Sequence, residues 1–292
     1  MRLKVNLQAK PNQIIPINYL HFLSSSIYHL LAKANLEFSS SLHQGEHISS
    51  SKKFKFFTFS WLQIPKKQIL NSTIKVFSPE ITWFISSPWQ EFVQYLVNGL
   101  LELGSIRVGK ENFPIIQVET LSDSLIPSPT LNPPSPLARP ASRSEAGEGE
   151  GRMRGEGEDE YKFLCLSPLV VTTKKEYNGK LAKYYYRPSD DQNEISEKIR
   201  QNLINKYVAF YQKESENTDL EILFDQQYIK KPDAEKLIDY KGIKIKAILC
   251  PFTAVGSADL IKFGYECGFG ELNSAGFGMV RNYEKNNEQR YK

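Results

Sequence analysis

Apolar and polar residues follow two similar patterns in the two halves of the chain. Alternation at Arg2–Gln8 predicts a strand, and apolar residues spaced three to four apart at about Ile17–Ala34 predict a helix. By the same criteria the first half continues with strands near Phe54–Leu62 and Ile74–Phe84, a helix at Pro88–Leu103 and a strand within Phe113–Thr120. The predicted order is β-α-β-β-α-β.

The second half repeats this order. Its predicted elements are a strand near Phe163–Thr173, a helix around Ser189–Tyr211, strands near Leu220–Tyr228 and Ile243–Phe252, a helix at Gly256–Tyr265 and a strand at Phe277–Tyr283. This order is that of the ferredoxin-like fold. We therefore expect an α+β protein with two tandem ferredoxin-like (RRM-like) domains, at residues 1–121 and 161–292. Because this fold supports many functions, the function has to be argued from a site.

The segment between the two predicted domains, residues 122–160, is rich in Pro, Ser, Gly and Glu and almost lacks aromatic residues. Such a segment cannot bury enough apolar surface to offset the entropy lost on ordering, which predicts a disordered insertion. The favoured interpretation of this insertion is a tolerated insert without a role of its own.

Composition narrows the class of protein. No apolar run approaches the roughly 18–20 residues of a membrane span, and the strand-like N-terminus does not resemble a signal peptide, so we expect a cytoplasmic protein without a membrane partner. The net charge is +4, but residues 141–160 are strongly acidic, so the rest is more basic and favours an anionic partner. The three cysteines are widely spaced and all four histidines precede residue 48, so we expect no metal site and no cofactor.

A glycine-rich stretch, GYECGFGELNSAGFGMV at residues 264–280, is the most distinctive motif. It lacks the Gly-Lys-Ser/Thr ending of a Walker phosphate loop. It also fails the dinucleotide fingerprint, because Asn273 stands at the third glycine position and the stretch follows a helix and precedes a strand. These differences argue against mononucleotide binding.

Such a loop after two ferredoxin-like domains resembles the RAMP superfamily of CRISPR-associated RNA-binding proteins, in particular its repeat-RNA-processing endoribonucleases. Further matches are Ile27-Tyr28, Leu42-His43, Phe57–Ser60, Val97–Leu101 and Leu166–Val171. The resemblance implies a metal-independent RNase that cuts precursor CRISPR RNA within its repeats. The RNA's 2′-hydroxyl attacks, leaving a 2′,3′-cyclic phosphate and a 5′-hydroxyl. The implied partners are CRISPR repeat RNA, a CRISPR effector complex and a second copy of the chain.

The resemblance also implies three catalytic residues, which map onto Tyr28, His43 and Lys55. Each suits the chemistry. A histidine can act as acid or base at neutral pH, a lysine can stabilise the charge of the phosphorane, and a tyrosine can donate a hydrogen bond. Whether His43 is the acid or the base stays open.

Each of these residues has an alternative. Tyr28 borders the apolar stripe of its helix and could be a core residue, and His21 lies on the same border. His43 is expected in a polar loop at residues 39–47, where His47 is its rival. Lys52 or Lys53 could take the place of Lys55; otherwise we expect both to contact the RNA backbone.

For RNA binding, the sequence offers the glycine-rich loop. The expected contacts are Gly268, Gly270, Asn273, Ser274, Gly276 and Gly278. Bare backbone at these glycines could approach either RNA phosphates or the facing domain. The aromatic group Tyr184–Tyr186 could stack on bases or pack on the second domain.

Two other functions compete with the endoribonuclease. One is a catalytically silent RAMP subunit that only holds CRISPR RNA, which would not need Tyr28, His43 and Lys55 together. The other is an RRM-like protein unrelated to CRISPR, which should carry aromatic RNP motifs on its central strands. We find no such motif in the sequence.

Overall fold

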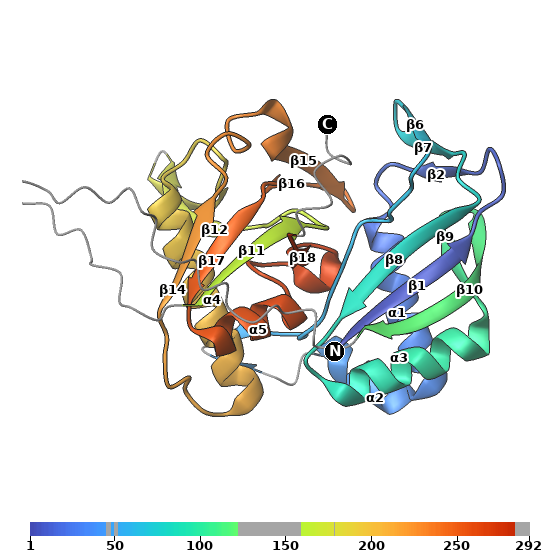
Figure 1. Ribbon diagram of the computed structural model, residues 1–292, viewed down its shortest axis with the longest axis horizontal. Coiled ribbons are helices and arrows are strands. Elements are labelled where there is room, and N and C mark those ends of the chain that lie inside the picture. The colour runs from blue at the N-terminus through green and yellow to red at the C-terminus, as the bar shows by residue number, and fades with distance from the viewer. Residues whose placement is uncertain (45–47, 50–51, 122–158, 178, 284–292) are drawn as a thin grey trace, which may run out of the picture.

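The computed structural model describes residues 1–44, 48–49, 52–121, 159–177 and 179–283. The chain forms two domains that lie side by side (Figure 1). The N-terminal domain contains β1 (Arg2–Gln8), β2 (Ile14–Pro16), α1 (Leu20–Ala34), α2 (Leu36–Gln44), β3 (Ile48–Ser49), β4 (Lys52–Lys53), β5 (Thr58–Phe59), β6 (Lys67–Leu70), β7 (Thr73–Val76), β8 (Glu80–Ser86), α3 (Gln90–Leu103), β9 (Ser105–Val108) and β10 (Glu111–Leu121). Within the described residues, no helix is long and apolar enough to cross a membrane.

The main sheet of the N-terminal domain has the order β5-β8-β1-β10-β9, with β1 antiparallel to both of its neighbours. Apart from the added edge strand β9, this is the antiparallel arrangement of a ferredoxin-like sheet. The alternation of apolar and polar residues that predicted β1 matches its burial, because Leu3, Val5 and Leu7 are buried.

Helices α1 and α3 pack closely against each other beside this sheet. The apolar stripe of α1 contributes Leu23, Ile27 and Leu30 to the core. At the helix crossing, a Cβ on Gly99 of α3 would collide with the backbone of Leu30. Gly99 is therefore required by helix packing.

The C-terminal domain repeats the arrangement. Its elements are β11 (Asp159–Cys165), β12 (Thr172–Tyr177), β13 (Lys180–Tyr185), α4 (Gln192–Tyr211), β14 (Leu220–Phe224), a 3₁₀ turn at Pro232–Ala234, β15 (Glu235–Tyr240), β16 (Ile243–Ile248), β17 (Phe252–Gly256), α5 (Ala258–Cys267), a second 3₁₀ turn at Asn273–Ala275 and β18 (Val280–Asn282). Its sheet has the order β14-β17-β11-β18, with β11 antiparallel to both neighbours. The predicted fold, two tandem ferredoxin-like domains, is confirmed.

Several predicted strands are divided in the structure. The prediction for Ile74–Phe84 spans β7 and β8, which belong to different sheets, and the one for Ile243–Phe252 spans β16 and the start of β17. Pro79 and Pro251 lie at these divisions, where proline cannot donate to a strand ladder. Between Phe163 and Thr173 the strand β11 already ends at Cys165.

Two other predictions need correction or fall outside the described chain. The polar loop expected at residues 39–47 is wrong for its first part, because α2 extends to Gln44 and includes His43. Of the predicted disordered insertion, residues 122–158 lie outside the described residues, and Asp159 and Glu160 belong to β11.

The two domains share buried apolar contacts. Val170 and Phe277 of the C-terminal domain are buried in the core of the N-terminal domain. From the N-terminal domain, the buried Arg2 of β1 reaches the C-terminal domain. Its guanidinium donates to the carbonyls of Val280 and Tyr265, at 2.8 and 3.0 Å. The domains are therefore joined by both packing and hydrogen bonds.

Candidate active site

Two of the three predicted catalytic residues are in direct contact. The Lys55 ammonium donates to the Tyr28 hydroxyl at 2.8 Å, and its nitrogen lies 4.9 Å from the centre of the tyrosine ring. Tyr28 projects from α1 and packs against the N-terminal core while remaining partly exposed. The ring of Tyr28 thus packs as a core residue would, as the alternative interpretation expected, whereas its hydroxyl makes a polar contact with Lys55.

Lys55 is held by the phenylalanines on either side of it. Phe54 and Phe56 pack into the core of the C-terminal domain, whereas Phe57 packs into that of the N-terminal domain. Phe57 stacks on Phe92 at 4.8 Å, and Phe56 has a left-handed backbone with φ 45°. This backbone conformation interrupts the strand predicted at Phe54–Leu62, which is reduced to Thr58–Phe59. As a result, Lys55 lies at the boundary between the domains.

His43 completes the cluster from the last turn of α2. Its ring centre lies 5.3 Å from that of Tyr28, with 62° between the ring planes, and its side chain is exposed. Helix α2 is joined to α1 because the Asn35 side chain accepts from the Phe38 amide at 2.9 Å and the Ser39 hydroxyl donates to the Tyr28 carbonyl at 3.1 Å. The structure therefore brings Tyr28, His43 and Lys55 together.

Burial shifts the pKa values of two of these groups. Burial raises the pKa of Tyr28 well above its ordinary value; Tyr240 acts in the same direction, and the Ser274 hydroxyl opposes it. Tyr28 thus remains protonated at neutral pH and can donate a hydrogen bond. Burial lowers the pKa of Lys55. A desolvated cation of this kind interacts strongly with an anionic phosphate.

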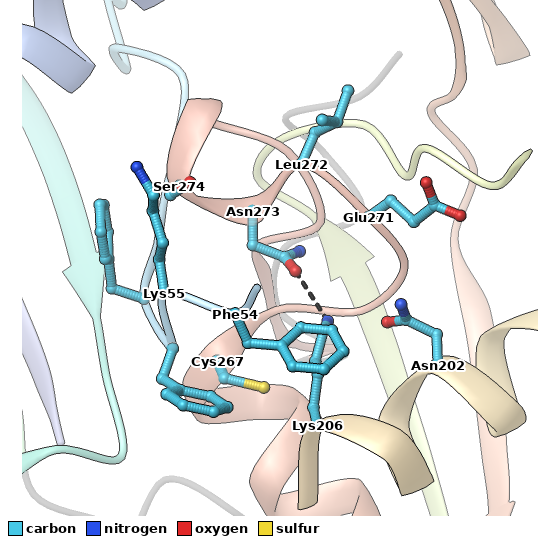
Figure 2. Close-up of a pocket in the computed structure, with 11 residues that line it drawn as sticks. Phe54, Lys55, Asn202, Lys206, Cys267, Glu271, Leu272, Asn273 and Ser274 are labelled. Atoms are coloured by element: carbon cyan, nitrogen blue, oxygen red, sulfur yellow. Dashed lines mark hydrogen bonds between the residues drawn. The ribbon is translucent and has the colours of Figure 1, made fainter. Parts of the chain in front are cut away.

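The glycine-rich loop is organised by a buried lysine that the sequence did not single out. The Lys206 ammonium of α4 donates to the carbonyls of Gly268 and Gly270, at 2.9 and 2.7 Å. It also donates to the Asn273 side chain at 2.7 Å, as Figure 2 shows. The Asn273 amide group donates in turn to the Phe269 and Phe277 carbonyls. The polar atoms of Asn273 are therefore used within the protein.

The loop also packs on the N-terminal domain. A Cβ on Gly276, whose φ is 92°, would lie 2.6 Å from the ring of Phe59. The Ser24 hydroxyl of α1 donates to the Ser274 carbonyl at 2.9 Å, and the Thr58 hydroxyl donates to the Phe277 carbonyl at 2.9 Å. These contacts correspond to one of the two roles expected for the glycines, close approach to the facing domain.

The backbone amides of the loop bear on the other expected role. Those of Gly268, Gly276 and Gly278 donate to carbonyls of this chain, at 2.8–3.0 Å. Contact of these amides with RNA phosphates would therefore require them to give up an existing hydrogen bond. RNA binding by the six predicted loop residues stays a prediction, and among them Ser274 lies beside Tyr28.

Other predicted residues lie elsewhere or outside the described part. His47 lies outside the described residues, and only the backbone of Lys52 and Lys53 is described, in β4. His21 lies in the first turn of α1 with its ring 6.3 Å from that of Tyr240, and burial lowers its pKa. Among the described side chains, no group of three His, Cys, Asp or Glu residues comes together in a way that could hold a metal ion.

A cavity of about 360 Å³ opens next to the cluster of Tyr28, His43 and Lys55, at the boundary between the domains. It is lined by Phe54, Lys55, Phe56, Phe57, Asn202, Lys206, Cys267, Glu271, Leu272, Asn273 and Ser274 (Figure 2). Sequence reasoning missed Asn202 and Lys206. The sequence pattern that could have indicated them is a lysine on the apolar face of α4, one turn of helix after Asn202.

The two-domain fold of this chain is shared with solved structures. A solved structure described as "An RAMP protein binding different RNA substrates" is 24% identical to this chain, with a TM-score of 0.71, and the match covers 97% of this chain and 100% of that one. At this identity, the likeness concerns the fold.

Sequence relatives define the family more closely. The model "CRISPR associated protein Cas6, C-terminal" matches residues 152–282, and "CRISPR-associated protein Cas6, N-terminal" matches residues 14–119. A relative named "CRISPR-associated endoribonuclease Cas6 1", from Methanocaldococcus jannaschii, is 32% identical over 100% of this chain and 96% of its own length. A solved structure described as "CRISPR associated protein Cas6" is 32% identical with a TM-score of 0.70, covering 97% of this chain and 99% of that one. The chain belongs to the Cas6 family of CRISPR-associated proteins.

Proposed function

We propose that this chain is an endoribonuclease that cuts precursor CRISPR RNA within its repeats. The observation that carries the proposal is the cluster of Tyr28, His43 and Lys55, in which Lys55 contacts the Tyr28 hydroxyl at 2.8 Å and the His43 ring lies 5.3 Å from the Tyr28 ring. Membership of the Cas6 family and the name of the Methanocaldococcus jannaschii relative support the same activity.

In the proposed mechanism the RNA supplies its own nucleophile. A 2′-hydroxyl attacks the adjacent phosphorus, and the bond to the 5′-oxygen of the next nucleotide breaks. The products carry a 2′,3′-cyclic phosphate and a 5′-hydroxyl, and no metal ion takes part. His43 transfers a proton, either from the attacking hydroxyl or to the leaving oxygen. Lys55 stabilises the charge on the phosphorane, and the protonated Tyr28 donates a hydrogen bond that keeps the phosphate in line.

The proposed partner is CRISPR repeat RNA. Delivery of the product to an effector complex and assembly into a homodimer belong to the same proposal. RNA contacts by Lys52, Lys53 and the glycine-rich loop are also part of it, because a phosphate backbone needs positive charge and close backbone approach.

The test is cleavage of the repeat RNA from the same genome with a single 2′-deoxy substitution at the mapped cut site. We expect cleavage of the all-ribose RNA and none of the substituted one, because the deoxyribose lacks the nucleophile. Persistent cleavage of the substituted RNA would exclude 2′-hydroxyl attack. Tight binding without any cleavage of the all-ribose RNA would instead favour the silent RAMP subunit.

A further inference from the structure

The cavity beside Lys55 has the composition of a site for an aromatic, hydrogen-bonding ligand. Its volume of about 360 Å³ is near the lower end of the roughly 300–1,000 Å³ typical of small-molecule sites. Phe54, Phe56 and Leu272 provide apolar surface, whereas Asn202 and Glu271 provide polar atoms. In Figure 2, Lys55 lies at one side of the cavity and Asn202 and Glu271 lie at the other.

We propose that this cavity receives one unpaired base of the RNA, from a nucleotide flanking the scissile bond, and that it selects a base with an exocyclic amino group. The proposal rests on the function proposed above and names part of its substrate specificity. Its first support is position. Lys55 and Ser274 line the cavity, and both belong to the surroundings of the Tyr28 hydroxyl. A phosphate held at Lys55 therefore has its neighbouring base within reach of the cavity.

The second support is an acceptor without a donor. Among the described residues, the side-chain oxygen of Asn202 has no hydrogen-bond partner although it is shielded from solvent. Such an unpaired acceptor is costly in a folded protein and is rare. Figure 2 shows the Asn202 amide directed toward Phe54 and Lys206. The ammonium of Lys206 already donates to three acceptors of the loop, which accounts for its three N–H groups.

The third support is the preponderance of acceptors at this side of the cavity. The Glu271 carboxylate accepts from the Thr172 hydroxyl, at 2.9 and 3.0 Å, which leaves it with further accepting capacity. Together with the Asn202 oxygen, it favours a ligand that brings N–H donors. Adenine, cytosine and guanine present an exocyclic amino group, whereas uracil does not. RNA-binding proteins read unpaired bases by stacking on aromatic rings and by hydrogen bonds to base edges.

The experiment uses the full chain and the repeat RNA of the same genome. Each nucleotide flanking the mapped cut site is replaced in turn by A, C, G, U or an abasic residue, and single-turnover cleavage rates are measured. At one of the two positions we expect amino-bearing bases to be cut at least about fivefold faster than uracil or the abasic residue, since a good pair of base contacts is worth about 5–150-fold.

Asn202→Ala should reduce that preference to less than about twofold, since it removes one of the selecting acceptors. The matched control is Asn205→Ala, on the same helix, where the side chain accepts from Gln201 instead of lining the cavity. This control should keep the preference. Equal rates for all five substitutions at both positions would overturn the proposal, as would a preference that survives in Asn202→Ala.

A binding arm separates this inference from the proposed function and does not depend on cleavage. Wild type and the two asparagine variants are titrated with repeat RNAs that carry 2′-deoxyribose throughout and one abasic residue at successive positions. If the wild type cuts no RNA, the proposed function fails. The base site is still supported in that case if an abasic residue at one position weakens RNA binding by the wild type but not by Asn202→Ala. Uniform binding across all abasic positions would overturn it.

Discussion

Replacing Lys206 with methionine tests how the glycine-rich loop is held. The variant keeps an unbranched side chain on the buried face of α4 but removes the donor for the Gly268 and Gly270 carbonyls and for Asn273. Each buried acceptor left without a donor costs about 1–3 kcal/mol, and the loss is partly offset because a buried ammonium no longer has to be desolvated. Three acceptors at this cost, less that offset, give an expected net loss of about 3–5 kcal/mol in the free energy of unfolding.

Urea unfolding followed by circular dichroism measures this change. With a slope of about 1–3 kcal/mol per molar urea, the midpoint should fall by at least about 1 M. Lys198→Met is the matched control, because Lys198 lies on the exposed face of the same helix and should change stability by no more than about 0.5 kcal/mol. Equal midpoints for the two variants would refute the assignment of Lys206 as the residue that organises the loop.

Three further predictions concern the reaction. His43→Ala should lower the single-turnover cleavage rate by at least about 100-fold with unchanged RNA affinity. The control is His29→Ala, which should have no effect although His29 is also an exposed histidine. An active His43→Ala beside an inactive His47→Ala would assign the role to His47 instead. Because burial lowers the pKa of Lys55, its positive charge is lost at a lower pH than in a free lysine, so kcat/KM should fall early on the alkaline side. Lys55→Arg should move that fall to higher pH, since arginine stays charged, and superimposable alkaline limbs would contradict this. Cleavage should be unchanged in excess EDTA, and a loss restored by magnesium would argue against the metal-independent mechanism.

Local periodicity predicted most of the elements that form the two main sheets, but it missed β9 and included only Phe252 of β17. The strand Arg2–Gln8 alternates because one face of the sheet is buried, and α1 has a single apolar stripe because only one side packs on that sheet. Repetition of the same order in both halves then indicated two ferredoxin-like domains. The prediction was less accurate where a proline divides an apolar run, as at Pro251, because periodicity alone does not show which sheet a strand joins.

The candidate site depended on contacts between distant parts of the chain. Helix α2 was missed because its apolar stripe is short and its serines favour turns, so His43 was expected in a loop. The surroundings of Lys55 were not predictable from its neighbours in sequence, since Phe56 and Phe57 are consecutive but are buried in different domains. The role of Lys206 depends on carbonyls more than sixty residues away, which no local pattern reports.

The division of Phe56 and Phe57 between two cores has a consequence for how the protein unfolds. Separating the domains would draw at least one of these rings out of its core, at a cost of about 1.5–3 kcal/mol for each ring exposed. The pair therefore couples the stability of one domain to that of the other, so we expect a single cooperative unfolding transition for both domains. Loosening either core should also release Lys55, so cleavage activity reports on the integrity of the whole two-domain unit.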